Sequence, residues 1–141
     1  MRTTTLYALA AVVIGVTGWA AGTDAQTPAA PAPAGNAQHG EYLVHHVAMC
    51  VECHSPRDEG GTIIPGSEFT GAPLPVRTPA HWATRAPRNR GLPGYDDEQA
   101  MRLLTEGAVA RDGRQLLPPM PRFRMTRQDA ADIISFLRSL K

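Results

Sequence analysis

Several features that would point to common protein classes are missing from this 141-residue sequence. The formal net charge is only +1 at pH 7, so the chain lacks the strongly basic stripe of a nucleic-acid-binding protein, and we expect no nucleic-acid partner. Internal repeats are absent. Only two cysteines occur, and neither lies near the end of the apolar N-terminal run, so a lipid anchor would have no attachment point.

The N-terminal 25 residues have the pattern of an export signal. A short, weakly basic start precedes an almost unbroken apolar run, and Thr23-Asp24-Ala25 is a small-x-Ala pattern of the kind that signal peptidase cleaves. We therefore predict a signal peptide over residues 1–25, cleavage before Gln26 and a periplasmic location. The alternative is an uncleaved membrane anchor, although residues 6–22 are only at the lower length limit for a bilayer span.

The rest of the chain predicts a linker and one domain. Residues 26–37 are rich in alanine and proline and offer few side chains that could pack, which is typical of an extended linker. Residues 38–141 are enough for one domain with one core and too few for two.

Three segments of this domain have helical patterns. Leu43, Val44, Val47 and Cys50 share one helical face. Asp96 with Gln99 forms a capping box for a second helix that buries Ala100, Leu103 and Leu104 and stops near Gly107. Thr126 caps a last helix with Asp129, and this helix buries Ala130, Ile133, Ile134, Leu137 and Leu140.

Long loops separate these helices. Residues 55–94 are rich in glycine and proline and have neither helical nor strand periodicity. A loop of this length in a compact domain is usually functional, and this one could wrap a large flat ligand. The chain is therefore predicted to be all-α, with three main helices, long loops and little or no sheet.

The strongest motif is Cys50-Val51-Glu52-Cys53-His54. On a helical turn, side chains three and four positions apart project from the same side. Two thiols placed in this way can reach two vinyl groups along one porphyrin edge, and His54 can then bind the iron. The motif predicts one haem c, attached covalently through Cys50 and Cys53.

Three other uses of the two cysteines are less consistent with the sequence. A thioredoxin-like redox pair expects a βαβ context, which is missing. A zinc site needs four ligands, and no second Cys/His pair has a suitable spacing. A disulfide between residues three apart would close a very small loop and stabilise little.

Met120 is the predicted second iron ligand. It lies in Leu116-Leu117-Pro118-Pro119-Met120-Pro121, where the prolines fix the backbone and so present the side chain. A thioether ligand also raises the reduction potential relative to two histidines. Met125 is the next candidate, and Met101 reads as a core residue. The remaining candidates are Met49, His39, His45, His46 and His81.

The sequence resembles the class I cytochrome c family from about Gln38 to Lys141. The segment Gly40-Glu41-Tyr42-Leu43 resembles the opening of the family's N-terminal helix, and Cys50 to His54 matches its attachment motif. Pro118-Pro119-Met120-Pro121 matches the distal loop, and residues 132–140 resemble the closing helix. The resemblance implies a fold in which the first and last helices cross beside one haem.

Within that family, the chain is similar to the haem units of cytochrome subunits that serve bacterial periplasmic dehydrogenases. The shared features are Phe69-x-Gly71-x-Pro73, Trp82 and the Gly107…Gly113-Arg114…Met120-Pro121 run. Those subunits often carry three haem domains, whereas this chain has one, and its loop after Met120 is short. The family also implies that a proline carbonyl, such as that of Pro65, accepts a hydrogen bond from His54.

With His54 and Met120 on both sides of the iron, no coordination position is open to substrate. This arrangement favours an electron carrier over an enzyme, accepting electrons from a periplasmic dehydrogenase or another respiratory donor. The alternatives are a haem enzyme or gas sensor with a labile sixth position, and a disulfide-bearing binding module without haem.

Arginines cluster in two segments, residues 69–95, which contain no acidic residue, and residues 107–128, which contain only Asp112. If they border the haem edge, the redox partner should present an acidic surface. The alternative is that these arginines are solvated or bind propionates. They are Arg77, Arg85, Arg88, Arg90, Arg111, Arg114, Arg122, Arg124 and Arg127.

Overall fold

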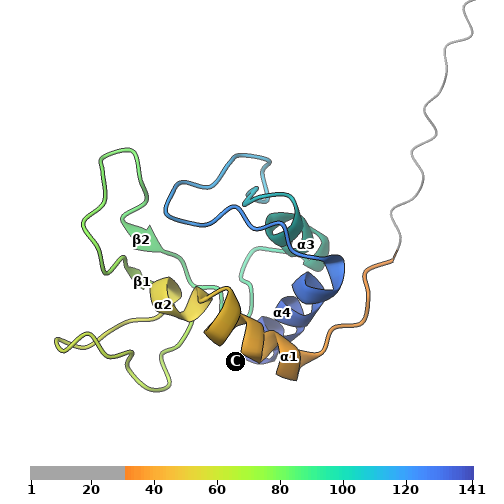
Figure 1. Ribbon diagram of the computed structural model, residues 1–141, viewed down its shortest axis with the longest axis horizontal. Coiled ribbons are helices and arrows are strands. Elements are labelled where there is room, and N and C mark those ends of the chain that lie inside the picture. The colour runs from red at the N-terminus through yellow and green to blue at the C-terminus, as the bar shows by residue number, and fades with distance from the viewer. Residues whose placement is uncertain (1–30) are drawn as a thin grey trace, which may run out of the picture.

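The computed structural model describes residues 31–141 as a mostly helical domain (Figure 1). The predicted signal peptide and most of the predicted linker lie outside the described residues. Helices occupy Ala37–Tyr42 (α1), Leu43–Val47 (η1), Cys50–His54 (α2), Asp97–Thr105 (α3) and Arg127–Ser139 (α4). The strands Ala72–Pro73 (β1) and Arg85–Ala86 (β2) form one short antiparallel pair, in which Ala72 is opposite Ala86. The all-α prediction is confirmed.

The first predicted helix is broken into three parts, and this corrects the expected burial of Val47. After α1 the chain makes a π-helical turn, η1, which ends where the Ala48 N–H donates to the Leu43 carbonyl at 2.7 Å. Met49 then adopts a left-handed backbone conformation (φ 51°) before α2 begins. This wide turn moves later side chains off the apolar stripe, so Val47 is 57% exposed while Val44 is fully buried.

Glycine at position 40 lets α1 and α4 cross closely. A Cβ atom at Gly40 would lie 2.0 Å from the Asp132 carbonyl oxygen and 2.9 Å from the Cβ of Phe136. Figure 1 shows the two helices side by side, with α3 next to α4. A larger residue would force the helices apart, so Gly40 sets their separation.

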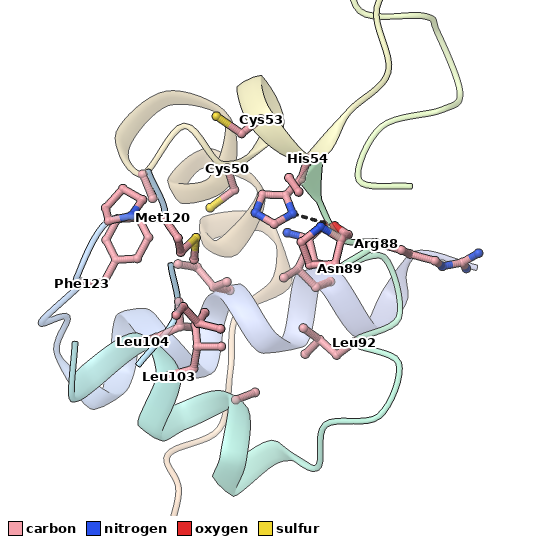
Figure 2. Close-up of a pocket in the computed structure, with 18 of the residues that line it drawn as sticks. Cys50, Cys53, His54, Arg88, Asn89, Leu92, Leu103, Leu104, Met120 and Phe123 are labelled. Atoms are coloured by element: carbon pink, nitrogen blue, oxygen red, sulfur yellow. Dashed lines mark hydrogen bonds between the residues drawn. The ribbon is translucent and has the colours of Figure 1, made fainter. Parts of the chain in front are cut away.

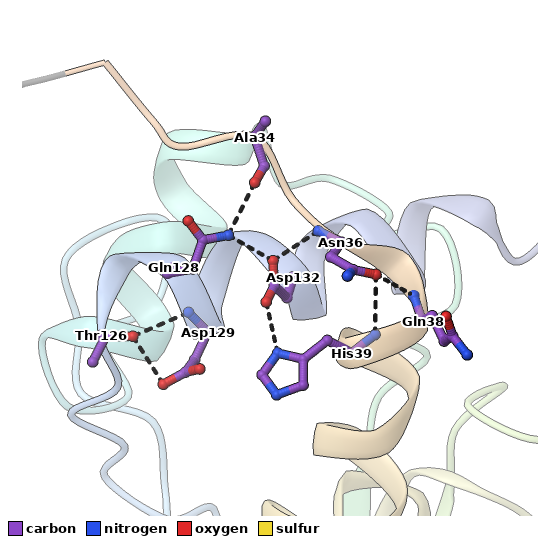
Figure 3. A network of polar contacts seen from close by, with 8 residues as sticks. All are labelled: Ala34, Asn36, Gln38, His39, Thr126, Gln128, Asp129 and Asp132. Carbon is purple, nitrogen blue, oxygen red and sulfur yellow. Dashed lines mark hydrogen bonds and ion pairs between the residues drawn. The ribbon is translucent and has the colours of Figure 1, made fainter.

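A buried carboxylate joins the same two helices (Figure 3). Asp132 is only 3% exposed and accepts hydrogen bonds from the Asn36 N–H, the His39 ring and the Gln128 side chain, at 2.7, 2.7 and 2.8 Å. Burial raises the pKa of Asp132, but these three hydrogen bonds outweigh it and hold the pKa below its usual value. The network ties the start of the described chain to α4.

The two later helices begin as predicted. Asp96 and Gln99 form the reciprocal capping box of α3, and Thr126 caps α4 by accepting from the Asp129 N–H. The buried face of α3 differs from the prediction at Leu103, which is half-buried, whereas Met101 is buried at 1% exposure.

The buried faces of the helices meet in one core. Val44, Met101, Ile133 and Phe69 are its largest fully buried apolar side chains, and Phe69 comes from the long loop rather than from a helix. Its ring packs edge-on against Phe136, with the ring centroids 5.9 Å apart. The loop is therefore anchored in the core. Among the described residues, no helix is long and apolar enough to cross a membrane.

Candidate functional site

Both cysteines and His54 lie on α2, a helix of five residues. The two thiols are free and half-buried. Burial raises the pKa of Cys50 to about 11, so its thiol is protonated at neutral pH. A thioether bond suits this environment because, unlike a metal-bound thiolate, it requires no charge on the sulfur.

His54 is held at two atoms. It is 7% exposed, its ring Nδ1 lies 2.7 Å from the Pro87 carbonyl oxygen, and its own carbonyl accepts from the Gly71 N–H at 2.8 Å. A carbonyl only accepts, so Nδ1 must carry the proton, and the lone pair of Nε2 is left for a metal. Burial lowers the pKa of His54 despite the opposing effect of the Pro87 carbonyl, which favours the neutral imidazole that a metal requires.

The prediction that the Pro65 carbonyl accepts a hydrogen bond from His54 is wrong. Pro87 takes this role because the loop folds back through β1 and β2 and returns to α2, 33 residues after His54. Pro65 instead lines a second hollow, of about 410 Å³, together with His45 and His46. Sequence reasoning had no signal for this choice, since the loop offers several prolines and no periodicity.

A cavity of about 620 Å³ adjoins α2. Its size is within the range of about 300–1,000 Å³ that is usual for cofactor sites. Cys50, Cys53, His54 and Met120 all line it, so the structure brings the four predicted site residues together. In Figure 2, the ring nitrogen of His54 that is not hydrogen bonded to the Pro87 carbonyl and the sulfur atoms of Cys50 and Met120 face this space.

The walls of the cavity are mainly apolar and come from distant parts of the chain. Figure 2 shows Leu103 and Leu104 of α3 on one side, and Phe123 from the same loop as Met120. Ile134 and Leu137 of α4 complete the wall. A flat hydrophobic ligand would therefore be excluded from water over most of its surface.

Met120 differs from the other methionines in its surroundings. It is half-buried on the cavity, between Pro119 and Pro121, which line the cavity as well. Met101 lies in the core, as predicted, and Met125 packs against the core while its backbone N–H donates to the Leu104 carbonyl. Met49 also lines the cavity, but it is 49% exposed and directly precedes Cys50.

The predicted alternative histidines lie elsewhere. None of His39, His45, His46 and His81 lines the cavity. His39 bonds Asp132, His45 packs edge-on against Phe69 at 5.3 Å, and His81 is exposed beside Trp82.

The polar residues at the cavity include two of the predicted arginines, Arg85 and Arg88, and one residue that sequence reasoning missed, Asn89. All three line the cavity next to the Pro87 carbonyl that accepts from His54. The Oδ1 atom of Asn89 is buried and has no hydrogen-bond partner among the described residues. A buried polar atom without a partner is uncommon in a finished fold and indicates that this end of the cavity accommodates a polar group of a ligand.

These features fit a haem. The apolar walls suit a porphyrin face, the two thiols of α2 suit covalent attachment, and a neutral imidazole is directed at the cavity. The arginines and Asn89 at one end suit the propionates, which are the anionic substituents on the edge of haem.

One comparison with known proteins shows the family of this chain. The family model described as Cytochrome c matches residues 37–141, which is most of the chain and includes all of α1 to α4. A search of curated proteins found no match.

Proposed function

Since the chain belongs to the cytochrome c family, we propose that it is a periplasmic electron carrier with one covalent haem c, His54 and Met120 binding the iron. The observation that supports this most strongly is the single apolar cavity that Cys50, Cys53, His54 and Met120 share. When bound, the haem iron supplies one-electron redox chemistry.

The chain supplies binding, orientation and exclusion of water. Cys50 and Cys53 would fix the porphyrin edge by two thioether bonds, and the Pro87 carbonyl would orient His54 by accepting its Nδ1 proton. The apolar walls lower the local dielectric constant, and a thioether from Met120 favours the ferrous state. With His54 and Met120 both holding the iron, substrate would have no access to it, which favours electron transfer over catalysis.

Absorption spectra of the exported, haem-loaded protein test this assignment. We expect sharp ferrous bands that remain with the protein after acid-acetone extraction, and a weak methionine-to-iron band in the ferric form. A covalent haem with a high-spin ferric spectrum would instead indicate an open iron site, and hence a haem enzyme or gas sensor. A protein that contains no haem would contradict the whole proposal.

Export is the second part of the proposal. A signal peptide over residues 1–25 would leave a mature chain that starts at Gln26. Mass spectrometry of the protein from the periplasmic fraction should give the mass of residues 26–141 plus one haem. A mass that includes residues 1–25, recovered with membranes, would indicate an uncleaved anchor.

The partner is proposed to be a redox protein with an acidic docking surface, such as a periplasmic dehydrogenase that serves as electron donor. Arg85 is at the cavity and exposed, and Arg122 and Arg124 follow Met120. Among the described residues, the side chains of these three arginines have no hydrogen bond or ion pair, so their charge is available. Arg111 and Arg114, by contrast, are engaged by the Gly94 carbonyl and by Asp112.

Ionic strength tests the docking surface. Exposed charges steer association over about 8–10 Å at physiological salt, so the rate of electron transfer with the partner should fall as salt is added. Replacing Arg122 and Arg124 by glutamine should reduce both the rate at low salt and its salt dependence. Arg102→Gln, at an exposed position on α3, is the control and should leave both the rate and its salt dependence unchanged. A rate that is independent of salt would contradict the docking surface and leave the haem assignment intact.

A further inference from the structure

One segment of the structure contacts both sides of the candidate haem site. Residues 71–87, here called the strap, form a hairpin on β1 and β2. At its base, the Gly71 N–H donates to the His54 carbonyl at 2.8 Å, and the Pro87 carbonyl oxygen lies 2.7 Å from the His54 Nδ1. Both ends of the strap are therefore hydrogen bonded to the same histidine.

The part of the strap beyond its base contacts the loop that carries Met120. The Leu74 N–H donates to the Thr84 carbonyl at 2.9 Å and so continues the ladder beyond the two short strands. The Ala83 N–H then donates to the Pro118 carbonyl at 2.8 Å, two residues before Met120. Leu74 and Ala83 also line the cavity, which means that the strap forms part of its wall.

The base of the strap is closed by a glycine that no other residue can replace without strain. Gly71 has φ +88°, and a Cβ atom there would lie 2.6 Å from the Arg88 nitrogen and 2.9 Å from the Pro87 carbonyl carbon. A side chain would thus push apart the two ends that bond His54. The glycine keeps the two hydrogen bonds to His54 in place together.

We propose that the strap is the positioning element that fixes Met120 relative to His54. Two bonds at His54, a short ladder and one bond at Pro118 form a continuous backbone connection between the two sides of the cavity. The Met120 loop has no helix or strand of its own to hold it, so this connection restricts how far the thioether can move away. The inference rests on the proposed ligation by Met120.

The hydrogen bond from Ala83 can be removed by a substitution that leaves Cys50, Cys53, His54 and Met120 unchanged. In Ala83→Pro the ring has no N–H to donate to the Pro118 carbonyl. Ala80→Pro is a matched control, because Ala80 is the second residue of the turn that the Trp82 N–H and the Pro79 carbonyl close at 2.9 Å, where proline is favoured. Both variants add one proline to the strap, but only the first loses the contact with the Met120 loop.

Imidazole binding to the ferric, haem-loaded protein measures how readily the thioether leaves the iron. We expect Ala83→Pro to bind imidazole about fivefold more tightly than the parent, equivalent to about 1 kcal/mol, while Ala80→Pro is unchanged. Covalent haem content and the urea midpoint of global unfolding, measured alongside, should not separate the two variants. A loosened Met120 should also weaken the methionine-to-iron band in Ala83→Pro alone.

Two results would overturn the proposal, and they differ. Equal imidazole affinities in parent, Ala83→Pro and Ala80→Pro, with the methionine-to-iron band present in all, would exclude the strap as a positioning element and leave the ligation intact. A parent without that band would contradict ligation by Met120, and the role of the strap would fall with it.

Discussion

The two sides of the candidate haem site are built in different ways. His54 is 7% exposed, lies on a helix and is hydrogen bonded through both its ring and its carbonyl. Met120 is half-buried in a loop without regular structure, and the nearest long-range backbone bond is the one between Ala83 and Pro118. His54 is fixed by its own surroundings, whereas Met120 depends on a contact made by a distant hairpin.

This difference suggests a division of roles between the two sides. On the proposed ligation, the side with both cysteines and His54 would retain the cofactor, because two thioether bonds and a buried, oriented imidazole do not come apart easily. The Met120 side would tune the iron, and it could be disturbed without loss of the haem. The following changes test this comparison, in order of decreasing effect.

The largest difference is expected between the two ligand substitutions. His54→Ala should abolish most haem-loaded protein, a greater loss than the roughly 10–100-fold that removal of a mere supporting partner causes. Met120→Ala should keep the covalent haem and lose the methionine-to-iron band, with a high-spin ferric spectrum. Haem content after acid-acetone extraction and ferric spectra measure both effects. Met125→Ala is the control that should keep the band, and equal haem loss in the two ligand variants would contradict the comparison.

Gly71→Ala should disturb the connection between the two sides. The left-handed conformation costs a side chain about 1–2 kcal/mol, and the collision with the Pro87–Arg88 backbone adds about 1–3 kcal/mol. We expect the free energy of unfolding in urea to fall by about 3 kcal/mol. Gly66→Ala is the matched control, since Gly66 has φ +80° but open space around its Cβ position. It should lose only the conformational cost of about 1–2 kcal/mol. Equal losses would mean that the close approach at Gly71 is unimportant.

Gly40→Ala tests the crossing of α1 and α4, in the segment that precedes α2 and His54. Alanine improves helix propensity by up to about 1 kcal/mol, but a Cβ atom 2.0 Å from the Asp132 carbonyl oxygen must force α1 from α4. Overpacking of this kind costs about 1–3 kcal/mol or more, so we expect a net loss of about 2 kcal/mol. Urea unfolding gives the value, and a variant as stable as the parent would show that α1 shifts freely.

The smallest effect concerns the Asp132 network and depends on pH. Because the folded-state pKa of Asp132 lies below its usual value of about 3.9, its stabilising contribution is present above that value. It is then lost as pH falls through the lower folded-state pKa. Asp132→Asn should cost about 1.5 kcal/mol at pH 7, and the difference from the parent should shrink below about pH 4.

Asp97→Asn is the control for that titration. Asp97 is an exposed partner of Arg138, so its loss should cost less than about 1 kcal/mol. Urea unfolding of the parent and both variants between pH 7 and pH 3 makes the comparison. An Asp132→Asn difference that stays constant down to pH 3 would contradict the assignment of the acid sensitivity to this carboxylate.

Structural features that depend on a few neighbouring residues could be predicted from the sequence alone. The spacing of Cys50, Cys53 and His54 on one helical turn, the capping box of Asp96 with Gln99 and the cap at Thr126 all involve side chains at most four positions apart. Their geometry follows from the helix itself. Met120 was identified as a site residue because its neighbouring prolines restrict the backbone in the same local way.

The contacts between residues far apart in the sequence became known only from the tertiary structure. Pro87, and not Pro65, accepts from His54, and Ala83 reaches Pro118, because the residues between them fold back as a hairpin that has no periodic pattern in the sequence. Val47 became exposed because a π-helical turn changed the helical register. Such pairings require loops of about thirty residues to close, and the entropic cost of closing a loop changes little with its exact length. The packing of the core therefore selects the partner, and the local sequence does not.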